Sequence, residues 1–255
     1  MLRDPVRYAI RYAITDRSQL GSSEPERRSA LRTLADRWAA AGIDFIQLRE
    51  KDLPAHELLQ LCRQLRSVLV AQGSRTRLLL NSGQDLPRAV EIARAAQLDG
   101  LHLTSSWLMQ FRSQSGDPSP TIPTPAELRA RFPTSQSVTI SVSCHSIAEV
   151  AATAASGVDL ILFGPIFGKS IRIPDSPAPD NPESTYRTVT PPTGLDPLRS
   201  ACILAGQTPV LALGGITPAN TALCLQAGAA GIAGIRLFQQ PDATVAAVPQ
   251  PAPNP

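Results

Sequence analysis

The sequence has few aromatic residues, few cysteines and little net charge. Aromatic side chains make up 4% of its 255 residues, and no apolar run approaches the roughly 20 residues of a membrane-spanning helix. The N-terminus lacks the apolar core of a signal peptide. The 24 Lys and Arg residues nearly balance the 21 Asp and Glu residues and are scattered along the chain. We therefore expect a cytoplasmic protein that binds neither membranes nor nucleic acid.

The cysteines do not form the pattern of a zinc site. Cys62, Cys144, Cys202 and Cys224 lie far apart, and none belongs to a CxxC pair. Isolated cysteines of this kind usually serve as small buried apolar residues. We predict a structural role for them.

Two apolar runs, at 160–163 and 209–213, lack polar alternation and end at small residues. Such runs predict strands of a parallel sheet that is covered on both faces by helices. Gly164 follows the first run, and Gly214 and Gly215 follow the second. Glycine at the end of such a strand lets a ligand, often a phosphate, approach the backbone. The two runs therefore predict an enzyme of repeated βα units with its site at the strand ends.

Eight short β-rich segments alternate with helical patterns along the chain. They lie at residues 8–15, 45–50, 78–81, 100–104, 138–143, 160–163, 209–213 and 231–235. A length of 255 residues suits a (βα)8 TIM barrel, which needs about 250. We predict a single barrel domain over 1–238 whose last helix is short or absent. A doubly wound open sheet is the alternative, but no GxGxxG motif follows the first strand.

Two segments rich in proline and polar residues interrupt the predicted barrel, at 105–124 and 168–194. Neither shows a clear helical or strand period over most of its length. We predict inserted loops, the second being a mobile lid over the strand ends. Residues 239–255 are rich in proline and alanine and predict a disordered tail.

Polar residues end the second, third and fifth predicted strands. Gln47, Arg49 and Lys51 alternate and would share one strand face, where two cations and an amide need an anion as partner. We predict that they bind the substrate; the alternative is pairing with the acidic residues at 16, 50 and 52. Asn81 and Ser143 also lie at strand ends, and we predict that they orient the substrate.

His145 lies just past the end of the fifth strand, where barrel enzymes gather their reactive groups. An imidazole pKa of about 6.5 suits the removal and return of a proton at neutral pH. The alternative is that His145 caps the next helix or faces solvent. Cys144 precedes it and points the opposite way on the strand, so we predict that it is structural. We expect His102 in the core and His56 on a helix surface.

The segments after the seventh and eighth strands predict a phosphate site. Gly214 and Gly215 follow one strand, and Gly234, Ile235 and Arg236 end the other. Loops at these positions bind phosphate in many TIM barrels, because backbone N–H groups without side chains can reach phosphate oxygens. The alternative is a tight turn that requires glycine, with Arg236 pointing outward.

Five short motifs, taken in order and spacing, resemble the thiamine phosphate synthase/TenI superfamily over residues 8–238. They are Tyr-Ala-Ile-Thr-Asp at 12–16, Gln-Leu-Arg-Glu-Lys at 47–51, Leu-His-Leu at 101–103, Gly-Pro-Ile-Phe at 164–167 and Leu-Gly-Gly-Ile-Thr-Pro at 213–218. The resemblance implies a TIM barrel that acts in thiamine biosynthesis on small phosphorylated intermediates, and it is compatible with a homodimer.

The chain departs from the synthase pattern at the positions that hold a metal. Synthases carry Mg²⁺-binding carboxylates after strands three and four; here Ser82 occupies the first position, and we assign Trp107 to the second. Neither side chain supplies the anionic oxygens that Mg²⁺ favours. The synthase segment after Gly-Pro-Ile-Phe is also altered, but Lys169 keeps a cation there, and we predict that it contacts the substrate.

Residues 141–146 are similar to a strand end of TenI-type thiazole tautomerases, in which the histidine is the acid/base residue and the magnesium carboxylates are missing. The resemblance therefore implies a thiazole tautomerase that acts on a thiazole phosphate, with His145 as general acid/base and no metal or other cofactor. One alternative is thiamine phosphate synthase, which couples a pyrimidine diphosphate to the thiazole phosphate and needs Mg²⁺. Another is a non-catalytic sensor of a thiamine intermediate.

Overall fold

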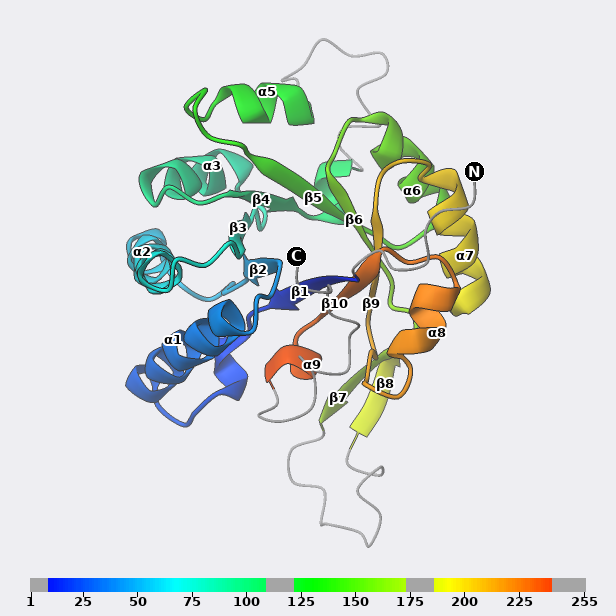
Figure 1. The fold of residues 1–255 in the computed structure, drawn as a ribbon, viewed down its shortest axis with the longest axis horizontal. Helices are drawn as coiled ribbons and strands as arrows, with labels where there is room; N and C mark the ends of the chain where they lie inside the picture. The colour runs from blue at the N-terminus through cyan, green and yellow to red at the C-terminus, as the bar shows by residue number, and fades with distance from the viewer. Residues whose placement is uncertain (1–8, 109–121, 173–185, 240–255) are drawn as a thin grey trace, which may run out of the picture.

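Eight parallel strands form a closed barrel at the centre of the molecule (Figure 1). The structure is a computed structural model that describes residues 9–108, 122–172 and 186–239, without the side chains of 169–172 and 186–190. The barrel strands are β1 (Ile10–Ile14), β2 (Phe45–Leu48), β3 (Arg77–Asn81), β4 (Gly100–Leu103), β5 (Thr139–Cys144), β6 (Leu160–Phe163), β9 (Val210–Leu213) and β10 (Gly231–Gly234). They pair in that order, and β10 returns to β1. The predicted TIM barrel is confirmed.

Helices alternate with the strands and surround the barrel (Figure 1). Those whose two ends both lie in the described ranges are a 3-10 turn at Arg17–Gln19, α1 (Glu24–Ala40), α2 (Ala55–Ala71), α3 (Leu86–Ala95), α5 (Pro125–Ala130), α6 (Ile147–Ala155), α7 (Leu195–Leu204), α8 (Thr221–Gln226) and α9 (Arg236–Gln239). Ser23 and Thr124 form capping boxes, and Asp85 and Ser146 each accept a hydrogen bond from the first turn that follows. These caps satisfy N–H groups that lack a partner within the helix and fix where each helix begins.

The apolar core has two parts. The larger part lies between the strands and the helices and includes Ile161 and Phe163 of β6. The smaller part fills the barrel interior and consists of Tyr12, Ile14, Leu79, Leu160, Leu162, Leu211 and Ala233. Members of the two parts alternate along β6, as the strand period of two requires. The barrel interior is therefore packed, and a polar side chain inside it needs a hydrogen-bond partner.

The prediction of an irregular loop over 168–194 is wrong at residues 169–172 and 186–190. Strand β7 (Lys169–Arg172) pairs antiparallel with β8 (Tyr186–Thr190), and this hairpin projects from the barrel (Figure 1). Tyrosine, valine and threonine make β8 strand-prone, and four of the prolines lie between the two strands, where they do not interrupt the ladder. The N–H groups of Thr193 and Gly194 donate to the carbonyls of Pro165 and Ile166 at 2.8 and 3.0 Å. Residues 173–185 lie outside the described part, and the lid role stays a prediction.

Two other boundaries differ from the prediction. Residues 105–108 are helical, and Trp107 and Leu108 belong to the core, so the first insertion begins later than expected. Gln239, which we assigned to the tail, ends the short α9, and its side chain donates to the Asp16 carbonyl at 3.1 Å. Residues 109–121 and 240–255 lie outside the described part. None of the helices in the described ranges is both long and apolar enough to cross a membrane.

Candidate active site

Four polar side chains cross the barrel interior and form what we call the lumen network: Tyr12, Ser141, His102 and Ser143. His102 Nε2 lies 2.9 Å from Ser143 Oγ, and His102 Nδ1 lies 2.9 Å from Ser141 Oγ. Ser141 Oγ in turn lies 3.0 Å from the Tyr12 hydroxyl. Three of the four residues are buried, whereas Ser143 is half-buried. The network therefore leads from the barrel centre to the end of β5.

His102 is neutral at physiological pH. Burial lowers its pKa to about 3, and the positive charge of Arg49 adds to the shift. Burial also raises the pKa of Tyr12 well above its ordinary range. The predicted core position of His102 is confirmed, but both ring nitrogens have hydrogen-bonding partners.

Gln47 and Arg49 lie at the end of β2. Gln47 is 1% exposed, and its Oε1 has no hydrogen-bond partner among the described residues. Such an orphaned acceptor costs about 1–3 kcal/mol, and a ligand donor would remove that cost. Arg49 is half-buried, and its backbone N–H donates to Thr15 Oγ1 at 2.9 Å. The predicted roles of both residues in substrate binding remain predictions that this geometry favours.

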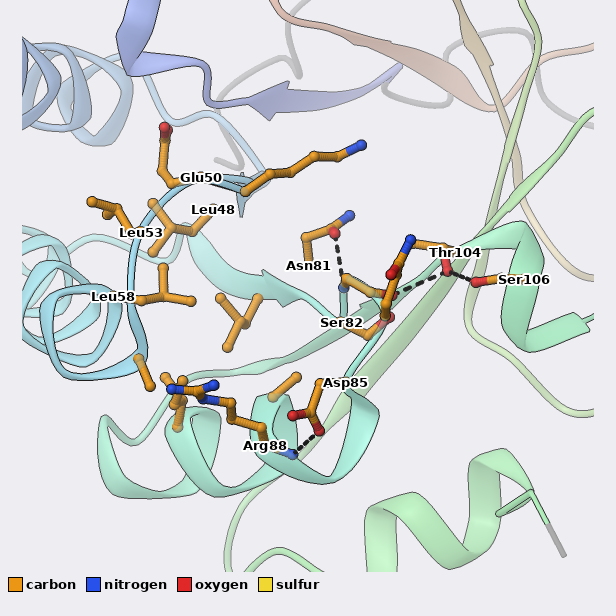
Figure 2. Close-up of a pocket in the computed structure, with 17 residues that line it drawn as sticks. Leu48, Glu50, Leu53, Leu58, Asn81, Ser82, Asp85, Arg88, Thr104 and Ser106 are labelled. Atoms are coloured by element: carbon orange, nitrogen blue, oxygen red, sulfur yellow. Dashed lines mark hydrogen bonds between the residues drawn. The ribbon is translucent and has the colours of Figure 1, made fainter.

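A cavity of about 550 Å³ opens between the carboxyl ends of β2, β3 and β4 (Figure 2). Its uncharged polar lining includes Asn81, Ser82, Thr104 and Ser106, and Lys51 adds a cation. Thr104 Oγ1 lies 2.5 Å from Ser106 Oγ, and both project toward the side of the cavity that Ser82 borders (Figure 2). The structure thus brings Lys51 and Asn81, two of the predicted substrate ligands, to one cavity.

The cavity does not present the donors that Mg²⁺ prefers. Glu50 and Asp85 border it, but each carboxylate is engaged. Glu50 accepts from Arg17 at 3.0 Å, and Asp85 accepts from the Arg88 backbone N–H at 3.0 Å as the cap of α3 (Figure 2). Within the described ranges, no three His, Cys, Asp or Glu residues gather as a metal site would require. The residues present therefore do not fit Mg²⁺, because neutral hydroxyls are poor substitutes for carboxylates.

Trp107, which we assigned to the second carboxylate position, does not line the cavity. Trp107 is 4% exposed, and its Nε1 donates to the Pro123 carbonyl at 3.2 Å. The helix that begins at residue 105 turns this ring into the core and leaves Ser106 exposed at the cavity. The Ser106 hydroxyl supplies no anionic oxygen either.

His145 lies past the end of β5, and its side chain is hydrogen-bonded to the next loop. Its Nδ1 lies 2.7 Å from the Gly164 carbonyl oxygen. Because a carbonyl only accepts, Nδ1 carries the proton of the neutral ring and Nε2 keeps its lone pair. The residue is exposed, and Ser146, not His145, caps α6. Nε2 is therefore the basic nitrogen that can meet a ligand.

The loops after β6 and β9 pack closely on each other. Gly214 and Gly215 have φ angles of +94° and +68°, and a Cβ at Gly214 would lie 2.5 Å from the Pro165 Cβ. Glycine is therefore required by the turn and the packing. In the described part of the chain no residue accepts from the N–H of Gly214 or Gly215. These N–H groups suit a phosphate. The geometry is therefore compatible both with a tight turn that requires glycine and with a phosphate site.

The remaining predicted ligands are only partly placed. Gly234 is buried at the end of β10, Ile235 is half-buried and Arg236 is exposed. The side chain of Lys169 lies outside the described part. Strand β2 ends at Leu48, so Lys51 sits in an exposed turn and does not share a strand face with Gln47. The expected alternation is wrong there, and phosphate binding stays a prediction.

Sequence reasoning overlooked Tyr12, Ser141, Ser82 and Ser106 as site residues. A signal existed for Ser141, because it alternates with Ser143 on one strand and pairs with His102 across β4 and β5. For Tyr12 no such signal existed, because an aromatic residue in a strand usually indicates plain core packing.

Comparison with known proteins agrees with this geometry. The profile of the family described as "Thiamine monophosphate synthase" matches residues 11–238. A Geobacter sulfurreducens protein, provisionally named as a thiamine-phosphate synthase, is 35% identical over 222 residues, which are 87% of this chain and 83% of that protein. Thiamine-phosphate synthase of Roseiflexus castenholzii is 30% identical over 227 residues, 88% of this chain and 78% of that protein.

A solved structure gives the same fold. Thiamine phosphate pyrophosphorylase from Pyrococcus furiosus superposes with a TM-score of 0.60 and 20% identity, covering 96% of this chain and 94% of that chain. At that identity the similarity concerns the fold alone. The family profile covers the barrel and its predicted site, and it matches the family to which the five sequence motifs point. The chain belongs to the thiamine monophosphate synthase family and is an enzyme of thiamine biosynthesis.

Proposed function

We propose that this enzyme is a thiazole tautomerase, which isomerises a thiazole carboxylate phosphate without a metal. The observation that carries the proposal is the orientation of His145, whose Nδ1 donates to Gly164 at 2.7 Å and leaves Nε2 basic. Isomerisation needs one group that removes a proton from the substrate and returns it to another atom. The hydroxyl-lined cavity after β3 and β4 supports the proposal, because this reaction requires no dication.

The other residues of the site would bind the substrate. The N–H groups of Gly214 and Gly215 would hold the phosphate, and Arg49 would pair with the carboxylate. The loop after β6 joins the two halves of the site: Gly164 accepts from His145, and Pro165 packs against Gly214. The base after β5 and the glycines after β9 thus both contact the loop after β6, the strand that lies between β5 and β9.

The test is turnover of the thiazole carboxylate phosphate tautomer in the presence of EDTA. The wild type, His145→Gln and His56→Gln are compared; His56 is the control because its side chain is 83% exposed on α2. Loss of a positioned acid/base group lowers kcat by about 10²- to 10⁴-fold, so His145→Gln is expected to fall by that amount and His56→Gln to match the wild type. Full activity of His145→Gln would remove it as the base. No turnover by the wild type would overturn the proposal.

Thiamine-phosphate synthase activity is the second candidate. Gln47 favours it, because a buried amide with an orphaned Oε1 suits a substrate donor, such as one on a pyrimidine ring. The names of the two relatives point the same way. Coupling of pyrimidine diphosphate and thiazole phosphate would be measured with Mg²⁺ and with EDTA. Mg²⁺-dependent product that Gln47→Leu abolishes would establish this activity. Tight binding without turnover in both assays would leave the sensor hypothesis.

A further inference from the structure

We propose that the lumen network carries its hydrogen bonds in one direction, which fixes the tautomer of His102 and makes Ser143 a hydrogen-bond donor to the substrate. Tyr12 donates to Ser141, and Ser141 donates to Nδ1 of His102. His102 then donates its Nε2 proton to Ser143 Oγ. The hydroxyl proton of Ser143 is left for the ligand.

The direction follows from the buried end of the network. The Tyr12 hydroxyl has two neighbours that can accept its proton, Ser141 Oγ at 3.0 Å and His102 Nδ1 at 3.5 Å. The rest of the barrel interior around it is formed by Leu79, Leu160, Leu162 and other apolar residues. No further acceptor for Tyr12 occurs among the described residues.

The reverse direction, in which His102 donates to Ser141, leaves one buried O–H group without an acceptor. If His102 donated from Nδ1, Ser141 Oγ would accept that proton, and either Ser141 or Tyr12 would hold an O–H without an acceptor. An imidazolium, which donates from both nitrogens, leaves the same orphan. A buried donor without a partner is disfavoured. The forward direction leaves every O–H and N–H of the three buried residues satisfied.

Charge around His102 agrees with a neutral ring. Arg49 is the charged group that acts on it, and a neighbouring cation disfavours protonation. Within the described part, the hydrogen-bond partners of its ring nitrogens are the hydroxyls of Tyr12, Ser141 and Ser143, and none is a carboxylate. The neutral ring therefore carries one N–H. Because Tyr12 donates to Ser141 and Ser141 donates to Nδ1, that proton lies on Nε2.

The direction of the network predicts which kind of ligand atom contacts Ser143. The hydroxyl proton of Ser143 favours an acceptor on the ligand, such as a ring nitrogen or a carboxylate oxygen. His102 and Tyr12 are positioning residues, because they act through Ser143. The direction of the network rests on geometry alone, whereas the identity of the ligand rests on the proposed function.

The first test is the nitrogen-15 NMR spectrum of the intact protein. The chain has three histidines, so His56→Gln and His145→Gln assign the signals by removing the other two. We expect His102 to show a protonated Nε2 and an unprotonated Nδ1 that stay unchanged from pH 5.5 to 8. A proton on Nδ1, or two protons on the ring, would overturn the proposal. This outcome does not depend on turnover, so a failed tautomerase assay leaves it intact.

The second test measures binding of thiazole carboxylate phosphate, with inorganic phosphate as the reference ligand. Loss of one hydrogen bond weakens binding by about tenfold, so Ser143→Ala is expected to lose that factor for the thiazole and nothing for phosphate. His102→Gln keeps an amide N–H that can donate to Ser143 and should bind nearly as the wild type, whereas His102→Met should resemble Ser143→Ala. Unchanged thiazole affinity in Ser143→Ala would contradict the donor role.

Discussion

Arg17 and Asp52 form a bidentate ion pair, with Nη1 2.8 Å from Oδ1 and Nη2 2.7 Å from Oδ2. Nη1 also lies 3.0 Å from Glu50 Oε2, and the side chains of Arg17 and Glu50 are only 4% and 2% exposed. Arg17 follows β1, and the two carboxylates follow β2. The ion pairs therefore hold together the loops that carry Arg49 and Lys51 to the site.

Substitution of Arg17 by methionine is expected to be strongly destabilising. It leaves Glu50 buried without its cation, and removing one partner of a buried pair costs about 3–5 kcal/mol. The free energy of unfolding in urea measures the effect. Arg199→Met is the matched control, because Arg199 and Asp196 are exposed and such pairs contribute roughly 0–1 kcal/mol. Similar losses in the two variants would show that the buried pair has no special role.

The stability of the protein should depend on pH through His102. Burial lowers its pKa to about 3, so between pH 6.5 and 3 the unfolded chain takes up a proton that the folded state does not. Stability therefore falls as the pH drops through this window, by up to about 1.4 kcal/mol per pH unit. The measurement is urea unfolding of the wild type and His102→Gln at several pH values from 7 to 5. The slope should be smaller in the variant.

A control variant and the behaviour of the carboxylates around Arg17 allow the difference in slope to be assigned to His102. His56→Gln, at an exposed position, should retain the wild-type slope. Arg17 lowers the pKa values of Asp52 and Glu24, so their contribution to stability is lost only at more acidic pH, as they become protonated. Burial raises the pKa of Glu50, but that contribution is common to all three proteins and cancels. Equal slopes in the wild type and His102→Gln would mean that His102 titrates normally.

The fold was predictable from local patterns, and the interior of the site was not. Unbroken apolar runs such as Leu160–Phe163 indicate a strand covered on both faces, and the eight β-rich segments that alternate with helical patterns indicate the barrel. Side chains alternate between two faces only within a strand, however. Because β2 ends at Leu48, Lys51 lies outside that alternation and lines a cavity with Asn81. The helix that turns Trp107 inward starts at a residue that no local signal marks. The lumen network joins Tyr12 to Ser141 across 129 positions, a separation that periodicity does not encode.

Gly214 should tolerate alanine worse than a glycine of similar conformation in open space. A Cβ at Gly214 would lie 2.5 Å from Pro165 Cβ, whereas Gly73, at φ +58°, has nothing within 4 Å. Gly73→Ala therefore costs only the left-handed conformation, about 1–2 kcal/mol. Gly214→Ala adds overpacking, about 1–3 kcal/mol more. Unfolding in urea gives both values, and equal losses would contradict close packing of the loops after β6 and β9.

The cavity after β3 and β4 should gain Mg²⁺ binding when two serines become carboxylates. Ser82 and Ser106 both border it, on neighbouring strand ends. Aspartates at both positions would supply the anionic oxygens that Mg²⁺ prefers and that the serine hydroxyls do not supply. A ligand that binds only the folded state stabilises it by RT ln(1 + [L]/Kd), so the Tm of Ser82→Asp/Ser106→Asp should rise with Mg²⁺ concentration. The wild type and the neutral Ser82→Asn/Ser106→Asn variant should show no such rise. A rise in the wild type would mean that Mg²⁺ binds through other groups, and the proposal of a metal-free reaction would lose the support of the cavity lining.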